Sequence, residues 1–237
     1  ASDDFVNNKL LSDHPSETKE KLKEKSTSIR FFKFLAENVT YNDSYKSLPF
    51  ISVNDETIID FNDKFVFLKS STGQSIFESK WLSSIEVGFV SDEYNAKTKK
   101  YFKENFGVVD FSHDYLIKNI ILNDDYRESI SERINEDYEI SKTFVDYCYN
   151  HKSLFESGSL RNYALSVYDG NGDNYFCLSE DVIYFSSNEY DEYAAKEWID
   201  NSWMYVLDEN YYDGIADKND FTGFLDKAFW GLKLTEK

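Results

Sequence analysis

The chain of 237 residues carries 26 basic and 44 acidic side chains, a formal net charge of −18. A field of that sign repels phosphate backbones and anionic lipid surfaces, so we expect neither nucleic acid nor a membrane as a direct partner. A content of 41% hydrophobic and 18% aromatic residues excludes a disordered chain and predicts a core built largely from Phe and Tyr.

The two cysteines, Cys148 and Cys177, lie within apolar patterns and lack the spacing of a metal site. Free, buried thiols are typical of a reducing compartment, which predicts a cytoplasmic location. The sequence shows neither the pattern of a signal peptide nor an apolar run long enough for a membrane span. Because the chain begins Ala1-Ser2 without an initiator methionine, we expect it to be a piece of a longer protein.

The first half of the chain shows helical patterns, then extended ones, then a helical one. The expected elements are a frayed or disordered terminus over 1–15, helices over 16–25 and 28–38, strands over 48–53, 57–61, 65–68 and 87–90, a short segment around Trp81, and a helix over 96–106. The glycine at position 107 is typical of a residue that follows the C-terminus of a helix.

The second half shows the same order of patterns. The expected elements are helices over 112–122 and 127–150, strands over 163–168, 175–178, 182–185 and 203–207, and helices over 190–200 and 221–229. The polar run Asn123-Asp124-Asp125 marks the expected boundary, which gives repeat unit 1 over 16–124 and repeat unit 2 over 125–237. N-terminal helices, a small sheet and a C-terminal helix in each unit predict the α+β class, with antiparallel or mixed sheets.

The sequence repeats itself at a shift of 117 positions. This shift aligns residues 58–68 with 175–185, Trp81 with Trp198, and 89–94 with 206–211. A shift of 113 aligns the helical residues 31–35 with 144–148. Such self-similarity predicts a tandem duplication of a unit that is large enough to bury its own core.

Signatures of catalysis are missing from the sequence. The three histidines, His14, His113 and His151, are not spaced as metal ligands are. His113-Asp114 could form an oriented base, but no Ser or Cys nucleophile motif accompanies it, so we interpret His113 as a surface or helix-start residue. Glycine-rich phosphate loops are also missing. We therefore nominate no catalytic residue, no cofactor and no metal ligand.

Residues 169–180 match most of the calcium-binding loop of an EF-hand. Asp169 stands at position 1 and Glu180 at position 12, but Asn174 occupies position 6, where the loop requires Gly. Both flanks read as strands, whereas an EF-hand needs helices, and Asp-Gly-Asn-Gly is common in hairpin turns. We interpret the segment as an enlarged turn, and the sequence leaves calcium binding there open.

Two short segments of the first half resemble the repeats of a known family. Leu48-Pro49-Phe50-Ile51, then a turn at Asn54-Asp55-Glu56, and then Phe65-Val66-Phe67-Leu68 are similar to units that follow the ATPase domain in very large sacsin-like proteins. Those proteins carry a chaperone-type GHKL ATPase head. The second half departs from the pattern at Ala164, where the proline is missing, and the ATP-binding motifs of the head are absent. The resemblance implies a middle segment that relays or scaffolds, without nucleotide binding.

Two hypotheses on function follow. The first is a non-enzymatic interaction or scaffold module in a chaperone-like, ATPase-linked protein, with other domains of the same chain or another protein as its partner, since repeats commonly build binding surfaces. The alternative is an enzyme with a carboxylate site between the repeats, formed by Asp92, Glu93, Asp208 and Glu209. Raised pKa values in one cleft would favour the enzyme, whereas scattered, solvated acids would favour the scaffold.

Overall fold

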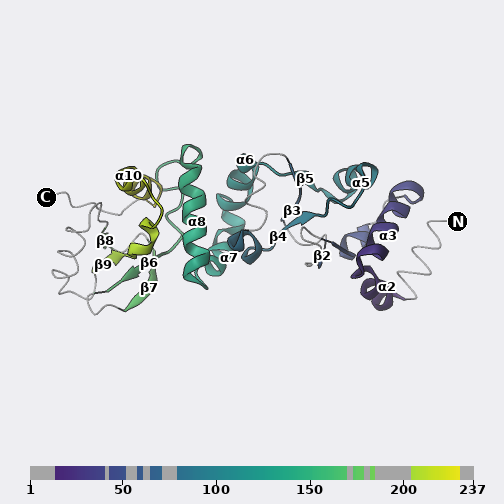
Figure 1. Ribbon diagram of the computed structural model, residues 1–237, viewed down its shortest axis with the longest axis horizontal. Helices are drawn as coiled ribbons and strands as arrows, with labels where there is room; N and C mark the ends of the chain where they lie inside the picture. Colours follow the sequence, from purple (N-terminus) through teal and green to yellow (C-terminus); the bar gives the residue numbers. More distant parts are fainter. Residues whose placement is uncertain are drawn as a thin grey trace. The chain divides into compact units, whose positions relative to one another are not determined.

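The computed structural model describes residues 14–40, 43–51, 58–60, 65–70, 79–169, 173–178, 182–184 and 204–229. Helices and strands are mixed along these ranges, as the α+β class requires (Figure 1). None of the helices in this part of the chain has the length and hydropathy that a membrane span needs. Residues 1–13 of the expected frayed terminus, and the expected helix over 190–200 with Trp198, lie outside the described residues.

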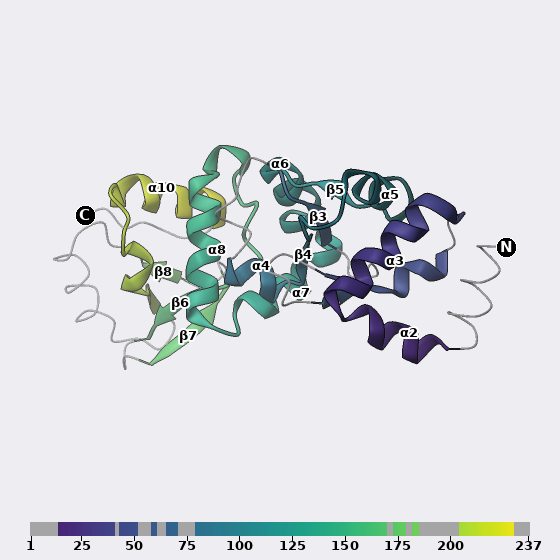
Figure 2. The same ribbon diagram turned by 45° about the vertical axis from the view of Figure 1, so that its right-hand side comes forward.

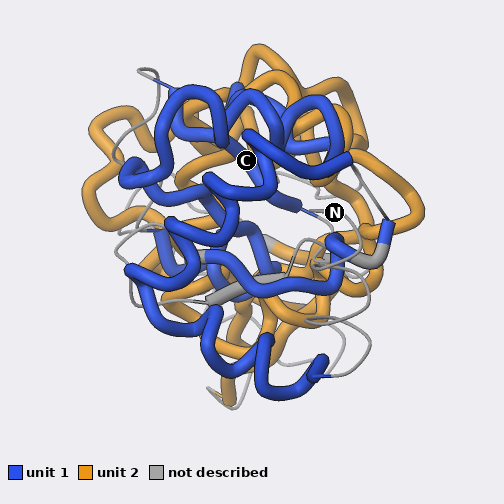
Figure 3. Tube along the Cα trace, turned by 90° about the vertical axis from the view of Figure 1, so that its right-hand side faces the viewer, with its two compact units in different colours: residues 1–112 blue, residues 113–237 orange. Residues whose placement is uncertain are grey.

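The chain divides into two compact units, residues 1–112 and 113–237 (Figure 3). We expected the division later, after Asp124. The segment between the two positions belongs to the second unit, because its Leu116, Ile117 and Ile121 are buried and the Tyr163 hydroxyl donates a hydrogen bond of 2.6 Å to the Ile121 carbonyl.

Unit 1 opens with the helices α2 (Pro15–Leu22) and α3 (Lys25–Asn38). Helix α3 buries Ser28, Phe32 and Leu35, which lie on one face because they are spaced four and three residues apart. This face packs against α5 (Ala96–Phe106), as Figure 2 shows. Helix α5 ends at Gly107, whose φ of 73° is left-handed, as the glycine predicted.

The strands of unit 1 form two sheets among the described residues. Strands β1 (Pro49–Ile51) and β2 (Ile58–Asp60) pair antiparallel. Strand β3 (Phe65–Leu68) lies between β4 (Val87–Val90) and β5 (Val109–Asp110), and both pair with it in parallel.

The second of these sheets corrects our expectation of antiparallel or mixed sheets. The connection from β3 to β4 contains the helix α4 (Lys80–Ser84), and the connection from β4 to β5 contains α5. Crossovers of this kind join parallel strands. Every residue of β3 and β4 is buried, which is typical of parallel sheets. Trp81 of α4 is also in the core, with 1% of its surface exposed.

Unit 2 opens with helices and continues into a mixed sheet, as expected. Its elements are α6 (His113–Leu116), a π-helical turn (Ile117–Ile121), α7 (Asp124–Ile134), α8 (Tyr138–Asn150), β6 (Leu165–Tyr168), β7 (Asn174–Cys177), β8 (Val182–Tyr184), β9 (Met204–Leu207) and α10 (Lys218–Phe229). The sheet order among the described residues is β7-β6-β9-β8, with only β8 and β9 parallel. Helix α8 lies against β6 (Figure 2).

The strand registers of the two units correspond residue by residue. Phe65 of β3 pairs with Val87, and Val182 of β8 pairs with Met204. The shift of 117 relates both members of the first pair to both members of the second, so the parallel register is the same in the two units. The helices α3 and α8 begin at positions 25 and 138, which are related by the shift of 113.

One sequence correspondence needs correction. In the antiparallel hairpin of unit 1, Pro49 pairs with Asp60, and in that of unit 2 Leu165 pairs with Cys177. The shift of 117 relates Asp60 to Cys177. Leu165, and not Ala164, therefore occupies the place of Pro49.

Candidate functional site

The C-terminal ends of β4 and β9 carry polar side chains. Strand β4 runs into Ser91-Asp92-Glu93-Tyr94, and β9 runs into Asp208-Glu209-Asn210-Tyr211. These two tetrapeptides are related by the shift of 117, and they contain all four acids of the enzyme hypothesis. We call them the strand-end segments.

Each strand-end segment closes with a buried tyrosine that is hydrogen-bonded to a buried serine. Tyr94 Oη lies 2.5 Å from Ser28 Oγ of α3, and Tyr211 Oη lies 2.7 Å from Ser141 Oγ of α8. All four residues are at most 2% exposed. The serines are related by the shift of 113 and the tyrosines by that of 117, so both partners follow the shifts of their own elements. Sequence reasoning missed this contact, although both shifts were visible.

Each strand-end segment also begins with the same turn. The amide of Glu93 donates to Ser91 Oγ at 3.3 Å, and the amide of Asn210 donates to Asp208 Oδ1 at 3.0 Å. A side-chain oxygen that binds the amide two residues later is a common turn motif of Ser and Asp. The turn bends the chain away from the strand, and the tyrosine that ends each segment then reaches the helix.

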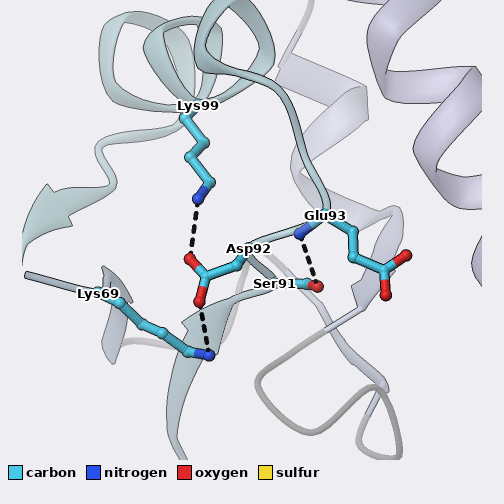
Figure 4. Close-up of polar contacts among 5 residues, drawn as sticks. All are labelled: Lys69, Ser91, Asp92, Glu93 and Lys99. Atoms are coloured by element: carbon cyan, nitrogen blue, oxygen red, sulfur yellow. Dashed lines mark hydrogen bonds and ion pairs between the residues drawn. The ribbon is translucent and has the colours of Figure 1, made fainter. Parts of the chain in front are cut away.

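In unit 1 both acids of this segment are paired with lysines, and Figure 4 shows the pairs of Asp92. The carboxylate of Asp92 binds Lys69 Nζ and Lys99 Nζ, each at 3.0 Å, and its side chain is 63% exposed. Glu93 forms an ion pair with Lys25. Partial burial favours a higher pKa for Asp92, but the hydrogen bonds from Lys99 and Lys69 outweigh it and lower the pKa. A carboxyl held ionised in this way is unsuited to donate protons near neutral pH.

In unit 2 the first acid of the segment is a structural residue. Asp208 is 1% exposed. Its Oδ2 accepts hydrogen bonds of 3.0 Å from Ser166 Oγ and Asn174 Nδ2. Its Oδ1 accepts from the amide and from Nδ2 of Asn210, at 3.0 and 2.8 Å. These donors compensate the loss of water around the buried charge. Glu209, the next residue, is exposed.

The four acids thus have different surroundings within their own units, and sequence reasoning did not distinguish them. Asp92 and Glu93 bind lysines, whereas Asp208 is enclosed by neutral donors. A catalytic carboxylate pair requires two acids whose environments separate their pKa values for the roles of acid and base. Within each unit, the described contacts serve ion pairing and turn formation.

Two of the three histidines lie together, which the sequence did not predict. The rings of His113 and His151 have centroids 4.2 Å apart. His113 Nδ1 lies 3.0 Å from Tyr147 Oη, and His151 Nδ1 donates to the Tyr147 carbonyl at 2.9 Å. Burial, followed by the proximity of His151, lowers the pKa of His113. The described residues hold no group of three or more side chains suited to bind a metal.

Residues 169–173, the first part of the segment considered for calcium, connect the antiparallel strands β6 and β7, as predicted. The Asp169 amide donates to the Asp173 carbonyl at 3.0 Å, and the Asp173 amide donates back to Asp169 Oδ1 at 3.0 Å. Asn174 stands where a calcium loop would need Gly, and its side chain instead donates a hydrogen bond to Asp208. This part of the loop is built as a hairpin turn, while residues 170–172 and Glu180 lie outside the described residues.

Both cysteines are free and buried, as predicted. Burial raises the pKa of the Cys148 thiol, so little thiolate is available for nucleophilic chemistry.

Comparison of the chain with models of protein families, with curated proteins and with solved structures found no match. The function is therefore inferred from the contacts described above.

Proposed function

We propose that this chain is a non-enzymatic interaction module made of two units that arose by tandem duplication. The observation that carries the proposal is the buried serine–tyrosine hydrogen bond that recurs in each unit, at Ser28–Tyr94 and Ser141–Tyr211. Its two members come from elements that are far apart in the sequence, a helix and the end of a strand. If the two units had arisen independently, the serine and the tyrosine would both have had to appear by chance at corresponding positions of the two units.

The strand registers support the same origin. The parallel pairs β3–β4 and β8–β9 keep the same register, and the hairpins β1–β2 and β6–β7 correspond with one residue added in the connection of the second. Register is strongly specified where a strand face is buried, so a duplicated framework is expected to keep it.

The acids of the strand-end segments support a binding role over a catalytic one. Lysines neutralise Asp92 and Glu93, and both carboxylate oxygens of Asp208 accept hydrogen bonds from residues of unit 2. The features shared by the two units are therefore those of the interior, while the polar contacts around them differ. This is the pattern expected of repeats that provide a scaffold and present different surfaces to protein partners.

We place the module in a larger chaperone-like, ATPase-linked protein of the cytoplasm. The residues that resemble the sacsin-like repeats form β1 and β3, which belong to the framework of unit 1. The two free, buried thiols suit a reducing compartment.

The proposal is tested with the full chain and two fluorescently labelled unfolded proteins, one basic and one acidic. We expect saturable binding of the basic protein in an anisotropy titration, because the chain has a net charge of −18. The same preparation should release no phosphate from ATP with magnesium beyond that of buffer. Absence of binding to both proteins, or phosphate release that Asp92→Asn abolishes, would overturn the proposal.

A further inference from the structure

Among the described residues, strand β7 stands at one end of the four-stranded sheet of unit 2. The hydrogen bonds of the neighbouring strand β6 show which backbone groups of β7 face outward. The Ser166 amide of β6 donates to Tyr211 Oη, and the Ser166 carbonyl accepts from the Asp208 amide, both at 3.0 Å. Those bonds lie on the side of β6 away from β7. Phe176, which is opposite Ser166, therefore forms a non-hydrogen-bonded pair with it. The N–H and C=O of Phe176 consequently point outward from the sheet.

Two large apolar side chains on or just after this strand are accessible. Tyr175 is 47% exposed and Leu178, just past the strand, is 45% exposed, the two highest values among the large hydrophobic side chains of the described residues. Protein edges are usually protected by lysine, proline or an inward-pointing charge. The four residues of β7, Asn-Tyr-Phe-Cys, include none of these.

The unit that contains this edge carries most of the negative charge of the chain. Unit 2 holds 11 basic against 26 acidic residues, a net charge of −15, whereas unit 1 has 15 against 18, a net charge of −3. At the beginning of β7, the negative charges of Asp173 and Asp169 raise the pKa of Tyr175. A second copy of β7 would bring the same charges to the edge and be repelled, whereas a basic segment would be attracted.

We propose that the β7 edge binds an extended, lysine- or arginine-rich segment of a partner protein by strand addition. The backbone of the segment bonds the outward N–H and C=O of Phe176, an apolar side chain packs beside Tyr175, and basic side chains lie toward Asp169 and Asp173. Main-chain bonds give the affinity in this mode of recognition, and side-chain pockets and charge give the selectivity. The inference rests on the proposed function as an interaction module.

The test uses the full chain and a labelled ten-residue peptide of alternating lysine and valine, with a glutamate–valine peptide as its control. We expect saturable anisotropy for the lysine peptide alone, weakened by added salt. Bound peptide should also slow hydrogen exchange of the Phe176 amide by about tenfold or more, because that amide becomes hydrogen-bonded.

Two variants address the edge. Phe176→Pro removes the outward N–H, a change that edge strands tolerate, and should weaken peptide binding by about tenfold. Tyr175→Lys leaves the backbone intact and should weaken binding of the lysine peptide by charge repulsion. Tyr115→Lys is the matched control, because Tyr115 is also in unit 2 and 39% exposed but belongs to α6. It should bind the peptide nearly as the parent chain does.

Four results would overturn the inference. The first three are a Phe176 amide already protected in the free chain, equal binding of the two peptides, and binding that neither β7 variant weakens. The fourth is protection of Phe176 that grows with protein concentration, which would assign the edge to a second copy. If the unfolded basic protein still binds in any of these cases, the interaction module stands and only the β7 assignment fails.

Discussion

The two units fill corresponding positions of their cores in opposite ways. In unit 1, Phe50 of β1 lies against Phe102 of α5, with ring centroids 6.2 Å apart. In unit 2 the corresponding residue of β6 is Ser166, because the shift of 117 relates the strand partners of the two residues. Ser166 donates to Asp208, which takes the place of Ser91 in unit 1. An aromatic contact in one unit is thus a buried polar network in the other.

The difference shows which features the framework requires. The serine–tyrosine bond, which ties the helix to the strand-end segment, occurs in both units, and so does the register of the parallel strand pair. The filling of the adjacent core is exchangeable, provided that every buried polar group finds a partner. Unit 1 fills this place with an aromatic ring, and unit 2 fills it with a hydroxyl beside a carboxylate that has four donors.

The largest effect is expected from removal of Trp81. The side chain is 1% exposed, so Trp81→Ala should lower the stability of unit 1 by about 3–5 kcal/mol, the usual range for a buried aromatic residue. Hydrogen exchange resolved by peptide should show the loss in residues 1–112 and little change in unit 2. Equal losses in both units would mean that the two cores are not separate. Trp198, at the corresponding position, lies outside the described residues, and the same result for Trp198→Ala in unit 2 stays a prediction.

The next effect distinguishes the two fillings. Asp208→Ala leaves Ser166, Asn174 and Asn210 without their common acceptor, and should destabilise unit 2 by roughly 2–3 kcal/mol. Ser91→Ala, the matched change in unit 1, removes a neutral hydroxyl that accepts a 3.3 Å hydrogen bond from the Glu93 amide, and should cost less than about 1 kcal/mol. Denaturant titration of both variants measures the two values, and similar losses would contradict the contrast between the units.

Sequence patterns predicted the elements that are specified locally. Strand β3 is four consecutive apolar residues and was placed with its observed bounds, as was β4. Gly107 marked the end of α5 because a left-handed residue there favours glycine. Strand β5 was missed, since its two residues are not fully buried and become a strand only by pairing with β3.

The candidate site was less predictable because its contacts are non-local. Ser28 and Ser141 read as ordinary helix residues, and their tyrosine partners are 66 and 70 residues away. The parallel pairing of β3 with β4 and β5 was also unpredictable, because it depends on how the connecting helices pack. The acids were located correctly, but their roles depend on lysines and amides from other elements, which no spacing in the sequence reveals.

A smaller effect tests the correspondence of the two serine–tyrosine bonds. Double-mutant cycles with Ser28→Ala and Tyr94→Phe in unit 1, and with Ser141→Ala and Tyr211→Phe in unit 2, should each give a coupling energy of about 1 kcal/mol. The two values should agree, because the distances of 2.5 and 2.7 Å and the burial are alike. A coupling present in one unit and near zero in the other would weaken the proposed duplication.

The smallest effect is a dependence of unit 2 on pH. Burial and His151 hold the pKa of His113 below its ordinary value of 6.5. The unfolded chain therefore takes up a proton first as the pH falls, and the stability contributed by the neutral ring is present above about pH 6.5 and lost as the pH falls through the folded pKa. The loss should be below about 1 kcal/mol, since His113 is only partly buried. His113→Asn should flatten this part of the stability profile between pH 7 and 5, whereas His14→Asn, at an exposed position of unit 1, should leave it unchanged. A profile that keeps its slope in His113→Asn would assign the dependence to another group.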